Sequence, residues 1–158
     1  MSFIFETYCQ DLKATEDLAA AFALEAKKGD TFALFGTLGV GKSVFARAFI
    51  QKLTKAPEVP SPTFTLIQTY EAPDFDIYHY DLYRLKSEEE IWELNIEEAL
   101  YSAVTLIEWP EKMGGYLPRD IFKIFISSDK DGIRTFNIEV CTQEKRTRLQ
   151  KISGLKEL

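Results

Sequence analysis

The sequence predicts an α/β fold in which a mixed sheet is flanked by helices and carries β-hairpins. A short apolar run, 31–35, is followed at once by a glycine-rich segment and then by a helix-like stretch, 42–53. Such a run is typical of a buried parallel strand. Two further pairs of strand-like segments flank short turns, as antiparallel hairpins do. Parallel strands together with hairpins imply a mixed sheet.

One strand and one helix are predicted before the apolar run. Residues 2–8 alternate loosely, which indicates an edge strand. Thr15 is predicted to be the N-cap of a helix, because Glu16 and Asp17 after it would lie in the first turn, where the helix dipole favours acids. We expect this helix to end near Lys28, at a Gly-Asp pair. In 42–53, after the glycine-rich segment, apolar side chains recur at helical spacing.

The middle of the chain predicts a hairpin followed by an interrupted helix. Prolines keep the stretch before the hairpin out of a helix. Segments 64–70 and 75–82 have the pattern of two strands around a short turn. Ser87 with Glu90 matches a capping box, so an acidic helix is expected to follow. Asn95 is expected to interrupt that helix, because Asn tolerates a left-handed conformation better than most residues.

The C-terminal part adds a buried strand, a second hairpin and a closing helix. Residues 103–107 form another apolar run. Segments 122–126 and 133–140 flank Asp131-Gly132, which is a strong hairpin turn signal. A helix rich in charged residues is predicted from about Gln143.

Length and composition predict one domain over 1–158, with 46% hydrophobic and 28% charged residues. No segment is apolar enough for a membrane span, and the N-terminus lacks the pattern of a signal peptide, so we expect a cytoplasmic protein. Cys9 and Cys141 lie far apart, outside any zinc-binding spacing. They are expected to be reduced, packed thiols.

The net charge of the chain indicates which kinds of partner it can bind by itself. Nineteen basic and 25 acidic residues give a formal charge of −6. Tight, independent binding to nucleic acid requires several phosphates to be neutralised at once, so it is not expected here. A role in RNA biology through a basic partner remains compatible with this charge.

The segment Gly36–Ser43 matches G-x-x-x-x-G-K-[ST], the phosphate loop of P-loop NTPases. Its glycines let successive N–H groups point inward at phosphate oxygens, and the following helix N-terminus favours the same anion. Lys42 would contact the β and γ phosphates, and the Ser43 hydroxyl could ligate Mg²⁺. The sequence therefore predicts a P-loop NTPase-like fold with a nucleotide held by Gly36, Leu38, Gly39, Val40, Gly41, Lys42 and Ser43.

Two carboxylates are candidates for the rest of the site, because a P-loop site needs an acid on its metal, usually at the end of a neighbouring strand. Glu108 ends the apolar run 103–107, and Asp81 lies in the strand 75–82. By alternation, Asp81 shares a face of that strand with His79. The residues alone do not divide metal ligation from water activation between the two acids.

Three other features receive weaker predictions. Ser61–Phe64 lies where ATPases place a switch segment, so Thr63 could reach the metal or the γ-phosphate. For His79, the only histidine, a packed strand residue bonded to the backbone is favoured over a catalytic base. Trp109 could stack on a base or a partner, or be an aromatic at the edge of the core.

These segments together resemble the TsaE (YjeE) family of ATPases in bacterial tRNA threonylcarbamoyladenosine (t6A) biosynthesis. The likeness covers roughly residues 13–134, most of the chain, and its S-P-T-[FY] and Y-H-x-D-L-Y-R patterns are the specific ones. The blocks that carry it, in order, are Lys13–Glu16, Gly36–Ser43, Ser61–Leu66, Tyr78–Arg84 and Ile107–Glu111.

The resemblance implies an ATPase that binds ATP and Mg²⁺ and docks on a TsaD–TsaB pair. That pair transfers threonylcarbamoyl to adenosine 37 of ANN-decoding tRNAs, and ATP hydrolysis is needed for multiple turnovers. The chain would then contact tRNA only indirectly. The resemblance implies Lys42 on phosphates, Ser43 and Glu108 on Mg²⁺, and Thr63 and Asp81 near the reacting phosphate. It implies nucleotide contacts from Thr15 and, more weakly, Arg134. Ser61 and Trp109 are further candidates for nucleotide binding.

Two positions depart from the family pattern. Thr37 replaces the usual aspartate after the first glycine of the loop, which puts any hydrogen bond of that acid in doubt. Asn95 replaces a usual glycine, a mild change since Asn tolerates positive φ. Two alternatives stay open: a stand-alone P-loop small-molecule kinase, and a nucleotide-dependent switch with negligible turnover. The scattered basic residues after Glu108 weigh against the arginine-rich lid of such a kinase.

Overall fold

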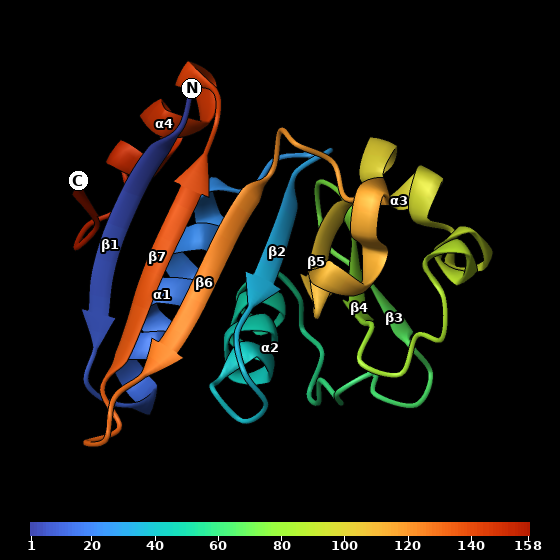
Figure 1. Ribbon diagram of the computed structural model, residues 1–158, viewed down its shortest axis with the longest axis horizontal. Helices are drawn as coiled ribbons and strands as arrows, with labels where there is room; N and C mark the ends of the chain where they lie inside the picture. Colours follow the sequence, from blue (N-terminus) through green and yellow to red (C-terminus); the bar gives the residue numbers. More distant parts are fainter.

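A long mixed sheet forms the centre of the computed structural model, which describes residues 1–158 (Figure 1). Its eight strands are β1 (Phe3–Cys9), β2 (Thr31–Phe35), β3 (Ile67–Glu71), β4 (Asp76–Asp81), β5 (Val104–Glu108), β6 (Phe122–Ser128), β7 (Arg134–Val140) and β8 (Lys156–Glu157). The helices are α1 (Leu12–Glu25), α2 (Lys42–Leu53), α3 (Ile96–Ser102) and α4 (Gln143–Gln150), with 3₁₀ segments η1 (Glu88–Leu94) and η2 (Pro110–Tyr116).

The strand order is β3-β4-β5-β2-β6-β7-β1-β8. The central strands β4, β5, β2 and β6 are parallel to their neighbours in that group. The outer strands are antiparallel, and β3–β4 and β6–β7 form the two hairpins. In Figure 1, α1 and α2 lie behind the sheet and α3 lies in front of β4 and β5. The predicted fold class is therefore confirmed.

The first helix begins before the residue that the sequence suggested. Its N-cap is Asp11, whose side chain accepts a hydrogen bond from the Ala14 N–H at 2.8 Å, so the assignment of Thr15 as N-cap is wrong. Aspartate caps helices as well as threonine does, and the earlier cap lets Thr15 lie buried inside α1. The helix ends at Glu25, three residues before Lys28, because Ala26 is extended.

Strand β3 starts at Ile67, later than the predicted residue 64. The chain turns first: the Leu66 N–H donates to the Pro62 carbonyl at 2.7 Å, and Leu66 has φ 69°. Strand β8 and segment η2 were not predicted at all.

Two local predictions are confirmed. The Ser87–Glu90 capping box is present, and Asn95 has φ 55° between η1 and α3.

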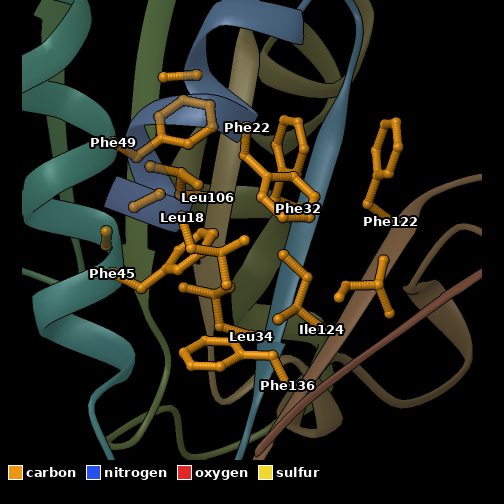
Figure 2. Packing of buried hydrophobic residues seen from close by; sticks show 14 of the residues in the cluster. Leu18, Phe22, Phe32, Leu34, Phe45, Phe49, Leu106, Phe122, Ile124 and Phe136 are labelled. Carbon is orange, nitrogen blue, oxygen red and sulfur yellow. The ribbon is translucent and has the colours of Figure 1, made fainter. Parts of the chain in front are cut away.

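Aromatic side chains fill the core between the sheet and the helices α1 and α2 (Figure 2). The rings of Phe32 and Phe122 stack at 4.7 Å, and Phe22 meets both Phe32 and Phe45 edge-on. Such edge and stacked pairs add to the stabilisation that burial provides. A second, smaller cluster covers the other face at β4 and β5, and it contains Tyr80, Leu82, Leu85, Ile91, Ile96, Ala99, Ile107 and Met113.

The order of the central strands brings the predicted site residues together. Strands β2, β4 and β5 run parallel, so all three end at the edge that lies at the bottom of Figure 1. Glu108 pairs in register with Leu34 of β2 and Asp81 of β4. The glycine-rich segment leaves this edge directly after β2. The carboxyl ends of parallel strands are where α/β folds place ligands.

Neither cysteine is paired, as expected: Cys9 is buried and Cys141 is partly exposed. None of the helices is long and apolar enough to cross a membrane.

A buried ion pair ties α4 to the start of β2. Arg148 donates to both oxygens of Asp30 and to the Glu25 carbonyl, and both charged side chains are buried. Removing one partner would leave the other charge buried and unpaired, so we expect Arg148→Ala to lower the free energy of unfolding by about 3–5 kcal/mol. Urea denaturation measures this. Lys13→Ala breaks an exposed pair with Asp17 and should cost less than about 1 kcal/mol; equal losses in both variants would contradict the assignment.

Candidate functional site

The glycine-rich loop 36–43 folds tightly against β6 and β7. A Cβ at Gly36 would lie 2.8 Å from the Ile126 carbonyl oxygen, and one at Gly41 would lie 2.9 Å from Arg134 Nε. Gly41 also has φ 116°, a value that L side chains rarely adopt. No side chain caps α2, so its first N–H groups are free to face an anion in the loop.

Lys42 is the first residue of α2, and its ammonium lies in the mouth of the loop. Its Nζ donates to the Gly36 carbonyl at 2.5 Å and sits 3.3 Å from the centroid of the Trp109 ring. Burial lowers the pKa of Lys42, and the charges of Glu108, Glu111 and Asp81 partly oppose this. The site therefore holds a partly desolvated cation, which favours an incoming anion.

The Glu108 carboxylate lies between two hydrogen-bond partners. Ser43 Oγ donates to Oε1 at 2.9 Å, and His79 Nε2 lies 2.6 Å from Oε2. Both Glu108 and His79 are buried. The packed strand position expected for His79 is confirmed, but the expected backbone partner is wrong. Alternation puts His79 on the same face of β4 as Asp81, and the register of β4 with β5 brings Glu108 onto that face.

Asp81 is bonded to the loop that precedes β3. Its Oδ2 accepts from Thr63 Oγ1 at 3.1 Å and from Ser61 Oγ at 3.4 Å. The two hydroxyl groups are 2.8 Å apart. Its Oδ1 accepts from the Tyr83 N–H at 3.1 Å. The carboxylate therefore anchors the Ser61–Thr63 segment at the edge of the sheet, beside Glu108.

A cavity of about 230 Å³ connects these groups. Most residues predicted for the site line it: Leu38, Gly39, Gly41, Lys42, Ser43, Ser61, Thr63, Asp81, Glu108, Trp109 and Arg134. Val44 also lines it and was missed, although any residue one position after Ser43 in the first turn of α2 would be near the loop. The Nε atom of Arg134 is buried without a hydrogen-bond partner.

Three predicted residues lie outside this cavity. Gly36 lines a neighbouring hollow, which it shares with Trp109 and Ser127. Val40 is part of the hydrophobic core. Thr15 is fully buried in α1, and its Oγ1 has no hydrogen-bond partner. The structure thus brings none of these three residues to the lining of the cavity.

Trp109 directly follows Glu108 in a left-handed conformation, φ 59° and ψ 49°. A bulky residue seldom adopts these angles, and such strain is concentrated at functional sites. The turn lays the indole ring over Lys42 and against Tyr83, with ring centroids 4.9 Å apart. The face of the ring therefore lies against the ammonium that an anionic ligand would contact.

The oxygen atoms available to a metal ion are few. No group of three or more Asp, Glu, His or Cys side chains forms a metal centre. Ser43 Oγ and Glu108 Oε1 are the adjacent oxygens at the loop. This donor set fits Mg²⁺, which takes one or two protein oxygens and completes its shell with water and phosphate oxygens.

The chain is similar to known proteins over most of its length. Residues 9–136 match the family model of the threonylcarbamoyl adenosine biosynthesis protein TsaE. A tRNA threonylcarbamoyladenosine biosynthesis protein TsaE of Rickettsia bellii is 43% identical over 134 residues, which are 84% of this chain and 93% of the relative. The TsaE of Bacillus subtilis is 36% identical over 79% of this chain and 77% of its own length. The crystal structure of Bacillus subtilis YdiB is similar in fold, with a TM-score of 0.79, 25% identity, and coverage of 97% of this chain and 96% of that one.

Proposed function

The chain belongs to the TsaE family, and we propose that it is the Mg²⁺-dependent ATPase subunit of tRNA t6A biosynthesis. The family is named for this pathway. The observation that carries the ATPase role is the cavity in which Lys42, Ser43, Glu108 and Asp81 face one another beside the glycine-rich loop. The product would be t6A at position 37 of ANN-decoding tRNAs, in the cytoplasm.

In this proposal the loop residues bind the nucleotide phosphates. The free N–H groups at the start of α2 and in loop 36–43 would donate to the phosphate oxygens. Lys42 would exchange its contacts with Gly36 and Trp109 for the β and γ phosphates. Ser43 and Glu108 would hold Mg²⁺, which when bound neutralises charge that develops on the phosphates.

Asp81 and Thr63 are proposed to act at the γ-phosphate. Their side chains line the same cavity and are hydrogen-bonded to each other. Ser43 is hydrogen-bonded to Glu108 and not to Asp81, and this supports Glu108 as the metal ligand and Asp81 as the group that orients the attacking water. His79 does not line the cavity, so it is not proposed as a base.

Asp81→Asn tests this division of roles. We expect ATP hydrolysis to fall by on the order of 100-fold, because an amide is a poor acceptor for the proton of the attacking water. ATP affinity and its dependence on Mg²⁺ should be unchanged, as measured by calorimetry. Asp76→Asn at the exposed start of β4 is the matched control. A variant that hydrolyses ATP normally, or that loses metal dependence, would contradict the role.

The formal charge of −6 supports action through protein partners rather than through direct binding to tRNA. TsaD- and TsaB-like proteins are the proposed partners, and tRNA would be reached only through their complex. The chain would provide ATP turnover, while the partner pair would carry out threonylcarbamoyl transfer.

ATP hydrolysis by the purified chain, alone and with the TsaD–TsaB pair, tests the function, with t6A formation followed in parallel. We expect the pair to raise hydrolysis and modified tRNA to accumulate. Hydrolysis that the pair leaves unchanged, together with phosphate transfer from ATP to a small metabolite, would contradict the proposal and favour a stand-alone kinase.

A further inference from the structure

The only histidine of the chain makes a single polar contact, and that contact is with Glu108. His79 Nε2 lies 2.6 Å from Glu108 Oε2, and the two side chains are each 2% exposed. The other ring nitrogen, Nδ1, is buried and has no hydrogen-bond partner. Packing alone does not explain a histidine here, because an apolar side chain would avoid the unsatisfied nitrogen.

The contact lies behind the cavity. Glu108 lines the cavity and His79 does not, so the carboxylate separates the imidazole from any ligand. Oε1 of Glu108 faces Ser43 and Oε2 faces His79. The hydrogen bond from His79 therefore selects which of the two equivalent oxygens points to the proposed metal position.

The two partners of Glu108 differ in what metal binding would do to them. Ser43 donates its hydroxyl hydrogen to Oε1 in this structure. A hydroxyl that ligates a cation offers a lone pair to it, so metal binding between Ser43 Oγ and Oε1 would change the geometry of their hydrogen bond. The His79 bond to Oε2 involves neither proposed ligand atom, so it would keep its geometry and orient the carboxylate once the metal is bound.

We propose that His79 is a positioning residue that fixes Glu108 so that Oε1 alone ligates the metal ion. This rests on the proposed role of Glu108 as the metal ligand. Hydrogen-bond partners of ligating side chains typically change metal affinity by about 10- to 100-fold when they are removed. His79 would act on the metal and leave the phosphate contacts of the loop and Lys42 unaffected.

Two substitutions of His79 distinguish a role in positioning Glu108 from a role in packing alone. His79→Gln places an amide N–H close to the position of Nε2, so it can still donate to Oε2. His79→Asn is also polar, but its shorter amide falls near Nδ1 and cannot reach the carboxylate. The probe is Mn²⁺ with ADP, followed by electron paramagnetic resonance, and ADP binding without metal is measured separately by calorimetry.

We expect His79→Asn to weaken Mn²⁺ binding in the presence of ADP by about 10- to 100-fold. His79→Gln should stay close to the unsubstituted protein, and metal-free ADP affinity should be the same in all three. Unchanged Mn²⁺ affinity in His79→Asn, or an equal loss in both variants, would overturn the positioning role. Glu108→Gln distinguishes a failure of the His79 role from a failure of the proposed metal site. If Glu108→Gln binds Mn²⁺ as tightly as the unsubstituted protein, Glu108 is not the metal ligand.

Discussion

Lys42→Ala should reduce ATP hydrolysis by on the order of 100- to 1,000-fold, because it removes the ammonium that would stabilise negative charge on the transferred phosphate. ATP affinity should fall as well. The Lys42 ammonium is partly desolvated in this structure, which lowers its pKa. A bound anion would compensate for the lost hydration of the ammonium. Phosphate release and calorimetry measure the two effects.

The control for Lys42→Ala is Lys52→Ala. Lys52 is an exposed residue in the last turn of the same helix, so its loss changes net charge equally without touching the cavity. The unfolding midpoints of both variants should show that the fold is intact. If Lys42→Ala is folded and hydrolyses ATP as the control does, the loop is not the phosphate site.

Glu108→Gln should abolish the response of ATP hydrolysis to Mg²⁺ and reduce turnover by on the order of 100-fold. The substitution keeps the shape of the side chain, and its amide oxygen can still accept from Ser43. It removes the negative charge that a hard cation requires. A titration of hydrolysis rate against Mg²⁺ concentration measures the change.

Glu111→Gln is the matched control for Glu108→Gln. Glu111 is exposed, and its charge acts on Lys42 from outside the metal position. It should retain the Mg²⁺ response. Full turnover with an ordinary Mg²⁺ dependence in Glu108→Gln would show that the metal is held by other groups, with Asp81 the nearest alternative acid in the cavity.

The sequence predicted the parts of the fold that short-range patterns determine. The motif Gly36–Ser43 required a strand before it and a helix after it, and β2 and α2 occupy those positions. The turn signal at Asp131-Gly132 lies in the loop between β6 and β7. Alternation in β4 correctly placed His79 and Asp81 on one face, but only Asp81 lines the cavity.

The features that the sequence did not predict depend mostly on contacts between residues that are far apart in the chain. That Glu108 bonds His79 depends on the register of β4 against β5, and no local pattern fixes the register between strands that are distant in sequence. Strand β8 has two residues and exists because β1 offers it a partner. The choice of Asp11 over Thr15 as N-cap was a choice between two suitable residues, and burial of Thr15 against the core decided it.

The number of t6A residues formed per TsaD–TsaB complex tests the central claim most directly. With this chain, ATP and Mg²⁺ present, we expect many tRNAs to be modified by each complex. With Lys42→Ala in place of the unsubstituted chain, modification should stop at about one tRNA per complex, because the proposed ATP hydrolysis would be lost. Repeated turnover supported by the Lys42→Ala chain would contradict the account.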